Sequence, residues 1–390
     1  MQWLYLVLFI TSLSLIIYTY FIYPIIVSLL SKLKSKPVAQ FTGDEELPTL
    51  TLIVSAYNSA KTLEKKIQNC LRLYYPKGRL QIIFVSDKHS EEVQEILSRY
   101  RKQGIANLRK IKLQDDDQAF HLGGKLAQGR IIVFSQAHTD LNDMALVTLA
   151  KNFKDKSVGA VSGKHDFYES RDSHTSFSNI LYSRYESTIK KAESKLASIT
   201  SADSQILAVR KSLFSGIIDK KLNYEDAIIY NLVKNGHRVI YETDANAFSN
   251  VPNDIKDDFK STRKKSEAFY RLTFSEWSNI FPPKTLYRFM FFSHRVLHLF
   301  VPFLLVILLA TSFALRQNEI VLIFLIVQLS VYGFSLINWL LRKVTVFKGF
   351  TSLIMYFVFM NIALFTGFTM YLFTGIKSLF RRKKQLKEST

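Results

Sequence analysis

The chain has 390 residues, of which 48% are hydrophobic and 14% aromatic, and it carries a formal net charge of +20. Its one cysteine, Cys70, excludes an intrachain disulfide and a zinc cluster built from several cysteines. No nucleic-acid recognition motif accompanies the basic charge, so we do not expect a nucleic-acid partner. Lys and Arg on the cytoplasmic flanks of membrane spans account for such a charge, with attraction to lipid or nucleotide phosphates as a further contribution.

Apolar segments open and close the chain, around a middle block of mixed composition. The first segment runs from Trp3 to Leu30, and it is long enough for a helix of roughly 20 residues that spans a bilayer. Three further spans are predicted near the C-terminus, at about His294–Leu315, Ile320–Leu341 and Ser352–Phe373. The protein is therefore expected to be an integral protein of the cell or inner membrane, anchored at both ends of its middle block.

The first span lacks a basic leading region and a small-residue cleavage site, so it is predicted to be a retained anchor. Lys32, Lys34 and Lys36 follow it, and the positive-inside rule then makes the middle block cytoplasmic. With four spans the basic cluster Arg381–Lys384 falls outside, which leaves open a re-entrant last segment, a missed boundary or a failure of the positive-inside rule. The predicted divisions are an anchor (1–36), a cytoplasmic domain (37–279), an interfacial amphipathic helix (280–292), a transmembrane region (293–376) and a basic tail (377–390).

The middle block alternates short apolar runs with segments of helical periodicity. Strands are predicted at Leu50–Ala56, Leu80–Val85, Leu108–Leu113 and Arg130–Ser135, and helices at Lys61–Leu73, Glu91–Tyr100, Gln118–Gln128 and Met144–Phe153. Cys70 lies on the apolar side of the first of these helices and is expected in the core. The alternation predicts an α/β fold with a mainly parallel sheet. Ligands bind at the carboxyl ends of such strands.

Three strand ends carry polar residues that could bind a ligand: Tyr57 and Asn58, then Asp87, then Gln136–Asp140. Neither of the glycine-rich phosphate-binding patterns, G-x-x-x-x-G-K or G-x-G-x-x-G, occurs in the chain. A nucleotide would therefore bind here without a glycine-rich loop.

Five segments in this order resemble a family-2 glycosyltransferase with the GT-A fold. They are SAYNSAKTLEKKIQNCLRLYYPKGRLQIIFVSD, GRIIVFSQAHTD, VGAVSGK, ADSQILAVRKSLF and NYEDAIIYNLVKNGHRVIYETDANAF. The resemblance covers roughly residues 48–275 and includes the membrane layout, and within the family it is nearest to polysaccharide or succinoglycan-type transferases. It implies a GT-A-like mixed, mainly parallel sheet with flanking helices.

For the donor side, the resemblance implies that Tyr57 and Asn58 line the nucleotide and that Asp87 binds the edge of its base. Arg263 and Lys264, followed by Lys265, resemble the basic segment that meets the diphosphate, where cations would stabilise the charge of the leaving group.

For the acceptor side, Glu225 and Asp226 resemble the acidic pair of the family. Asp226 is the expected general base, which would take the proton of the acceptor hydroxyl while that oxygen attacks the anomeric carbon and inverts it.

The chain departs from the family at the metal motif, where Gln136-Ala137-His138 replaces Asp-x-Asp. His138 can bind a metal through its imidazole, and Asp140 is the candidate carboxylate, whereas the neutral Gln136 suits Mg²⁺ or Mn²⁺ poorly. The Gln-x-x-Arg-Trp motif of processive members is also absent, since the chain reads Lys260-Ser-Thr-Arg263.

Several of these residues have a purely structural alternative. Asp87 could close an Asx turn or cap a helix. Asp226 could cap its helix, because the helix dipole stabilises acidic side chains near the N-terminus. His138 could be a solvated loop side chain, and Arg263 could belong to a basic face near the membrane. Asp115–Asp117 precede a predicted helix and are expected to cap it rather than bind a metal.

The leading hypothesis is an inverting glycosyltransferase that moves a sugar from a nucleotide diphosphate to a membrane-associated acceptor, a lipid-linked or growing glycan, with polysaccharide-assembly proteins as possible partners. The alternative is a weak or inactive relative that acts as a partner in a polysaccharide-assembly complex, which Gln136 favours and the acidic pair opposes. A transporter is disfavoured because few charges lie within the spans.

Overall fold

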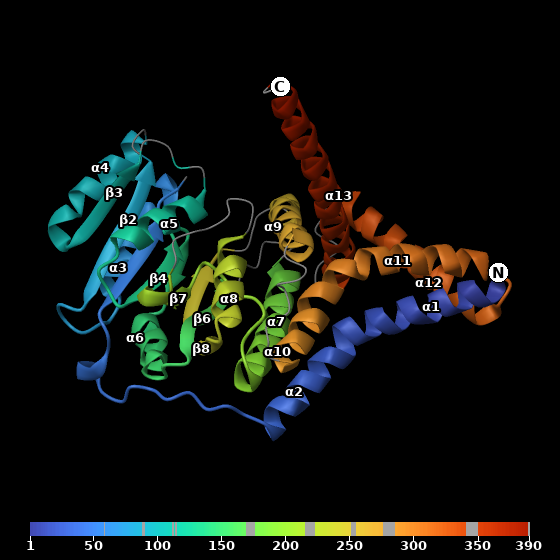
Figure 1. Cartoon of the computed structure of the whole chain (residues 1–390), viewed down its shortest axis with the longest axis horizontal. Coiled ribbons are helices and arrows are strands. Elements are labelled where there is room, and N and C mark those ends of the chain that lie inside the picture. The colour runs from blue at the N-terminus through green and yellow to red at the C-terminus, as the bar shows by residue number, and fades with distance from the viewer. Residues whose placement is uncertain are drawn as a thin grey trace.

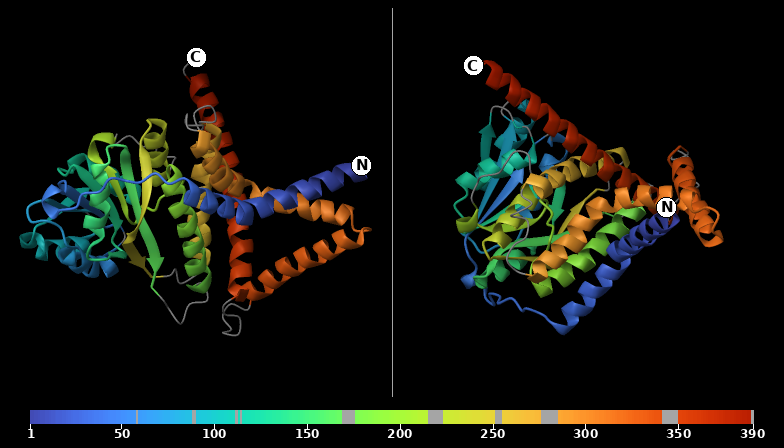
Figure 2. Two further views of the ribbon diagram at one scale, coloured as in Figure 1. Left: turned by 90° about the horizontal axis from the view of Figure 1, so that it is seen from below. Right: turned by 45° about the vertical axis from the view of Figure 1, so that its right-hand side comes forward.

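The computed structural model describes residues 1–57, 59–87, 90–110, 113, 115–168, 176–214, 223–250, 255–275, 285–340 and 350–388. It consists of an α/β domain joined to a group of long apolar helices (Figure 1). Seen from below, the sheet and the long helices lie on opposite sides, with α7 (Ser176–Leu196) and α9 (Ile255–Ser275) between them (Figure 2, left).

The domain is built on a sheet of eight strands in the order β3-β2-β1-β4-β7-β6-β8-β5. The strands are β1 (Leu50–Ser55), β2 (Leu80–Asp87), β3 (Ile105–Lys110), β4 (Ile131–Gln136), β5 (Thr139–Leu141), β6 (Val158–Phe167), β7 (Leu207–Arg210) and β8 (Arg238–Ser249). β1 to β4 pair in parallel, as do β6 and β8, whereas β7 is antiparallel to both of its neighbours and β5 is antiparallel to β8. The predicted mixed, mainly parallel sheet is confirmed.

The sheet separates two layers of core. Every residue of β1 is buried, and alternate side chains enter opposite layers: Ile53 enters one, Leu52 and Val54 the other. The flanking helices are α3 (Ala60–Arg72), α4 (Glu91–Arg99), α5 (Asp116–Leu126), α6 (Ala145–Ala150) and α8 (Tyr224–Lys234), besides α7 and α9. Cys70 is buried in the second layer, as predicted.

The third predicted strand, Leu108–Leu113, is displaced. The structure forms it as β3, which starts three residues earlier and pairs Ile105 with Ile82 of β2. Polar residues interrupt the apolar run here, so the pairing with β2 fixes the strand more than its own pattern does.

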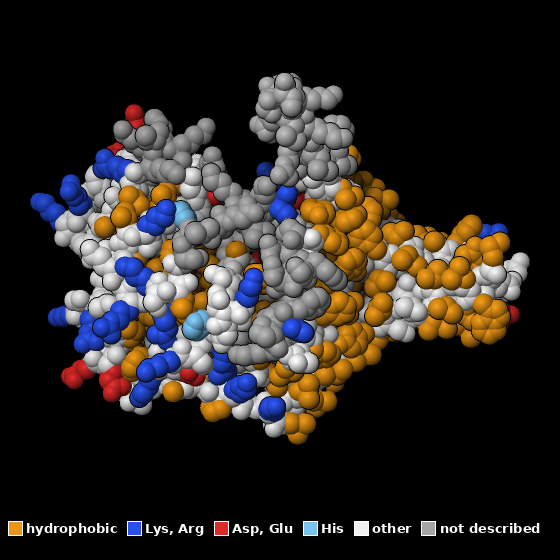
Figure 3. Space-filling view, viewed as in Figure 1, with side chains coloured by type: hydrophobic (Ala, Val, Ile, Leu, Met, Phe, Trp, Pro, Cys, Tyr) orange, Lys and Arg blue, Asp and Glu red, His pale blue; other side chains and the backbone are white. Residues whose placement is uncertain are grey.

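Among the described residues, four helices are long and apolar enough to cross a membrane: Gln2–Leu33, Thr285–Ala314, Glu319–Leu340 and Ser352–Gly375. They consist of α1 (Gln2–Ile17), a π-turn η1 (Tyr18–Ile22) and α2 (Tyr23–Leu33); α10 (Thr285–Phe291), a π-turn η6 (Phe292–Val296) and α11 (Leu297–Ala314); α12 (Glu319–Leu340); and part of α13 (Phe350–Glu388). The predicted one N-terminal and three C-terminal spans are confirmed. Hydrophobic side chains gather over these helices, whereas Lys and Arg gather on the sheet domain (Figure 3).

Two of the predicted divisions end inside continuous helices, at residues 292 and 376. The predicted interfacial segment 280–292 coincides from Thr285 onward with α10, which runs into η6 and α11 without a break, and its first five residues lie outside the described part. The backbone of the basic tail belongs to α13 up to Glu388.

Candidate active site

The carboxyl ends of three neighbouring strands form one edge of the site. Ser55 at the end of β1 lies opposite Val85 of β2 and opposite Gln136 of β4. Tyr57 lies two residues beyond Ser55, and Asp87 lies two residues beyond Val85, so these two predicted donor residues lie at the same edge of the sheet. Tyr57 is exposed, and Asn58 lies outside the described residues.

Asp87 is held at this edge by the chain that follows β3 and by α4. Its Oδ2 accepts a hydrogen bond from the backbone N–H of Leu113 at 3.2 Å, and its carbonyl oxygen accepts one from the amide of Gln94 at 2.8 Å. The side chain is half-buried. The carboxylate is therefore oriented by the fold before any ligand binds.

The acidic pair lies at the start of α8, and both carboxylates are buried. The oxygens of Asp226 are 2.9 and 3.0 Å from Nη2 of Arg295, and Asn223 donates to Oδ2 at 3.3 Å. Glu225 points to a different cation, with its Oε1 3.9 Å from Nζ of Lys265. The two neighbouring carboxylates thus have separate partners, one in η6 and one in α9.

Burial sets the protonation behaviour of this region. It raises the pKa of Glu225, which Lys265 lowers and the charge of Asp226 raises further. Burial also raises the pKa of Asp117 to about 7, and the carboxylates of Glu225 and Asp115 add to that shift. Asp117 therefore titrates near neutral pH next to the acidic pair.

An aromatic cluster supports the start of α8. Tyr224 precedes the acidic pair and is fully buried. The centre of its ring lies 5.4–6.3 Å from the ring centres of Phe120, Phe134 and Phe214. These rings belong to α5, β4 and the segment after β7. The packing fixes the start of α8 against the sheet, and with it the position of Glu225.

The cations of α9 lie near the acidic ends of two helices. The charge of Lys264 lowers the pKa of both Asp116 and Asp117 at the start of α5. Lys265 is exposed, and the charges of Glu225 and Asp203 raise its pKa. Arg263, half-buried, lies in the same turn of α9. The structure thus places part of the predicted basic segment at the site.

Of the predicted metal ligands His138 and Asp140, the aspartate has protein partners of its own. The carboxylate of Asp140 is bound by Nζ of Lys65 at 2.5 Å and by the hydroxyl of Tyr168 at 2.6 Å. Lys65 lies on α3 and Tyr168 lies just after β6, so the Asp140 carboxylate is held between these two elements. In the part of the chain that the structure describes, no group of three His, Cys, Asp or Glu side chains could hold a metal.

Asp116 is the carboxylate whose charge acts most strongly on His138, and Asp203 acts in the same direction. Burial raises the pKa of Asp116, whereas a hydrogen bond with Ser55 and the charge of His138 lower it. Desolvation lowers the pKa of His138, and Asp116 opposes that shift. Asp115 caps α5, as predicted, with Oδ1 accepting from the N–H of Gln118 at 3.0 Å. The capping prediction therefore holds for the first aspartate, while the second faces the site.

Sequence reasoning missed a buried lysine beneath this edge. Lys66 of α3 is fully buried, and its Nζ donates to Ser135 Oγ at 2.9 Å and to the carbonyl oxygen of Thr139 at 2.6 Å. It stabilises the turn between β4 and β5 that carries His138. The apolar pattern of α3 conceals it, because its neighbours Leu63 and Ile67 fit a core-facing helix.

A second missed group joins three segments next to His138. Nδ1 of His165 lies 3.0 Å from Oδ2 of Asp203, and Nε2 lies 2.9 Å from Oγ of Ser249. Burial raises the pKa of Asp203, but His165 lowers it, and the pKa lies below its ordinary value. No local sequence signal links these residues, which come from β6, the segment before β7 and the end of β8.

The strand order, the polar edge and the acidic pair define a GT-A type glycosyltransferase domain attached to membrane helices. The family model for glycosyl transferase family 2 matches residues 51–215. The chain therefore carries a family 2 glycosyltransferase domain, and it is a membrane protein of that class.

Relatives of known name agree with this assignment. The poly-beta-1,6-N-acetyl-D-glucosamine synthase of Staphylococcus aureus strain COL is 25% identical over 215 residues, which cover 53% of this chain and 51% of the relative. The synthase of the same name from Staphylococcus epidermidis is 22% identical over 254 residues, covering 63% and 61%. The chain spans about half the length of the first of these relatives.

A solved structure extends the likeness to the membrane helices. A mannosyltransferase from Pyrobaculum calidifontis, in complex with GDP-Man and Mn²⁺, matches with a TM-score of 0.70 and 18% identity. The match covers 94% of this chain and 99% of that one. At this identity the likeness concerns the fold.

We predict that Lys265→Met moves the acidic limb of the pH–rate profile for sugar transfer to higher pH. Lys265 lowers the raised pKa of Glu225, so without it the carboxylate stays protonated to a higher pH. The control is Lys260→Met, an exposed lysine of the same helix. An unmoved limb, or an equal shift in the control, would contradict this electrostatic account.

Proposed function

We propose that the protein transfers a sugar, with inversion, from a nucleotide-diphosphate sugar to a membrane-associated glycan or lipid-linked acceptor. The observation that carries the proposal is the buried acidic pair Glu225–Asp226, whose Asp226 is held by Arg295 of a membrane helix. The polysaccharide synthases among the relatives support a glycan acceptor.

On the donor side, Tyr57, Asn58 and Asp87 would bind the nucleotide at the ends of β1 and β2. Arg263 and Lys264 of α9 would meet the diphosphate. Cations in a poorly hydrated site stabilise the negative charge that develops on a departing diphosphate. These positions would leave the sugar pointing toward the start of α8.

On the acceptor side, Asp226 would take the proton of the acceptor hydroxyl. The freed oxygen would attack the anomeric carbon as its bond to the diphosphate oxygen breaks, and the electron pair of that bond would leave with the nucleoside diphosphate. Attack opposite the leaving group inverts the anomeric configuration. Glu225 stands one residue away and faces Lys265, so separate variants distinguish the two carboxylates.

We propose that the catalytic domain is cytoplasmic, because Lys32, Lys34 and Lys36 follow the first membrane helix. We retain the five divisions of the chain that were predicted from the sequence. Polysaccharide-assembly proteins are the proposed partners. A domain fixed to the bilayer at both ends would meet an acceptor at the membrane surface.

His138 and Asp116 fit a divalent cation, Mg²⁺ or Mn²⁺, that is bound mainly through the donor. Such ions are often held by one or two protein ligands together with substrate phosphates. One imidazole and one carboxylate, each acting on the other's charge, meet that need. When bound, the ion would neutralise charge on the diphosphate. The alternative co-ligand is Asp140.

We predict that purified full-length protein transfers labelled sugar from at least one uridine or guanosine donor in the presence of Mg²⁺ or Mn²⁺. Asp226→Asn should lower kcat by about 100-fold or more, because the amide cannot accept the proton. Glu225→Gln is the matched variant and should retain more activity. A folded wild-type protein that turns over no donor would favour the inactive-relative hypothesis.

We predict that removal of divalent metal lowers transfer by about tenfold or more. Asp116→Asn should raise the Mn²⁺ concentration for half-maximal activity by about tenfold, whereas Asp140→Asn should change it by less than about twofold. The measurement is a metal titration of the initial rate. The reverse order of the two variants would restore Asp140 as the co-ligand.

A further inference from the structure

The membrane helix Thr285–Ala314 changes its winding where it meets the catalytic domain. The α-helical turns of α10 give way to the π-turn η6, and α11 then continues into the apolar part. A π-turn inserts an extra residue, and such turns are frequent at functional sites because they re-aim side chains. Here the re-aimed residues are His294 and Arg295, two polar side chains at the edge of an apolar helix.

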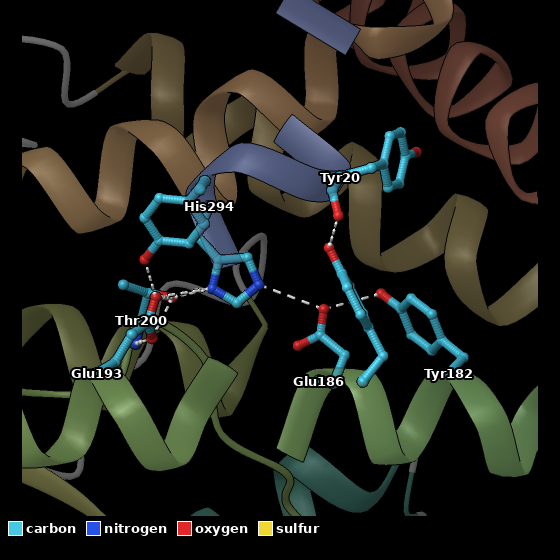
Figure 4. A network of polar contacts seen from close by, with 8 residues as sticks. Tyr20, Tyr182, Glu186, Glu193, Thr200 and His294 are labelled. Atoms are coloured by element: carbon cyan, nitrogen blue, oxygen red, sulfur yellow. Dashed lines mark hydrogen bonds and ion pairs between the residues drawn. The ribbon is translucent and has the colours of Figure 1, made fainter. Parts of the chain in front are cut away.

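His294 is held between two carboxylates of α7. Its Nδ1 lies 2.9 Å from Oε1 of Glu193, and its Nε2 lies 3.3 Å from Oε1 of Glu186 (Figure 4). Thr200 Oγ1 lies 2.9 Å from the same Nδ1, and the ring stacks on Tyr23 of the N-terminal anchor. Since each ring nitrogen faces a carboxylate, a protonated ring donates to both.

Glu193 is a fully buried carboxylate with a complete set of partners. It accepts from the hydroxyl of Tyr23 at 2.5 Å and from the backbone N–H of Thr200 at 3.0 Å, besides facing His294. A buried carboxylate is costly unless it is paired and hydrogen-bonded. The anchor, α7 and η6 therefore fit together in one arrangement, which fixes η6.

The neighbour of His294 reaches the acidic pair. Nη2 of Arg295 contacts both oxygens of Asp226 at 2.9 and 3.0 Å, and its guanidinium lies 4.4 Å from the centre of the Phe269 ring of α9. Asp226 itself is buried. A side chain from a membrane helix thus fixes the rotamer of a carboxylate at the start of α8.

We propose that Arg295 is a positioning residue for Asp226 and that the His294 clamp holds Arg295 in place. The membrane helix then forms part of the catalytic machinery as well as an anchor. The inference rests on the proposed role of Asp226 as the base. During transfer the acceptor proton passes to Asp226, while Arg295 keeps its charge and holds the carboxylate toward the acceptor hydroxyl.

The test compares Arg295→Met, Arg295→Lys and a control in purified full-length protein. Arg295→Met should lower kcat by about 10- to 100-fold, because small misplacements of a reacting group are that costly. The KM for the donor should stay within about threefold, since the donor edge is untouched. Arg295→Lys keeps the charge and should recover a measurable part of the lost kcat.

The matched control is Arg271→Met, an arginine of α9 that pairs with Glu267 at 3.0 Å and donates to Thr374. It joins α9 to a membrane helix as Arg295 does, but at a different site, so its kcat should stay within about threefold of wild type. In the Asp226→Asn background, Arg295→Met should cause little further loss, because the carboxylate that it positions is already gone.

Three results would overturn the inference while wild type transfers sugar. They are an unchanged kcat in Arg295→Met, an equal fall in the Arg271→Met control, and a full additional loss in the double variant. Thermal unfolding is measured for each protein. If Arg295→Met does not fold, the same comparison is made with Arg295→Gln, and an unchanged kcat in that variant overturns the inference as well. A wild type that transfers nothing instead removes the proposed function, and this inference with it.

Discussion

The burial of the Glu193 carboxylate is the constraint on which the arrangement of this protein depends. A charge without solvent access requires partners, and these come from Tyr23 of the N-terminal anchor, Thr200 after α7 and His294 of the C-terminal membrane helix. Undocking either membrane helix would leave the carboxylate short of partners. The catalytic domain and the membrane helices are therefore expected to dock as one unit.

The same docking explains how charges are shared around the site. Carboxylates at the starts of α5 and α8 face cations of α9 and η6, so neither set is compensated within its own element. Burial raises the pKa of Glu225 and Asp117, which makes this region sensitive to any added charge. A diphosphate and a cation are charges of the kind that such a region would recognise.

Much of the fold could be predicted because the strands and helices in the first half of the domain are marked by local sequence patterns. β1, β2 and β4 are continuous buried apolar runs, and α3 and α4 show clear helical periodicity. In the second half, β7 has only four residues and lies between β4 and β6, which are far from it in sequence. Pairing of that kind leaves little pattern in a single sequence, and the resemblance carried most of the prediction there.

The site could be predicted at the strand ends but not in its long-range contacts. Asp115 was expected to cap α5 and does so, whereas nothing in the triplet shows that Asp116 faces His138. Arg295 lay at the start of an expected span, 69 residues from Asp226, and only the docked helix brings the two together. Lys65 holds Asp140 in a similar way, which the extended segment alone does not reveal.

The most direct test of the account is an experimental structure of the wild-type protein in lipid nanodiscs with a bound nucleoside diphosphate. The account predicts the base against Asp87, the diphosphate between Lys264 and His138, and Arg295 within hydrogen-bond distance of Asp226. A nucleotide bound away from the ends of β1 and β2 would contradict the proposed donor site. Arg295 separated from Asp226 would contradict the claim that a membrane helix positions the catalytic carboxylate.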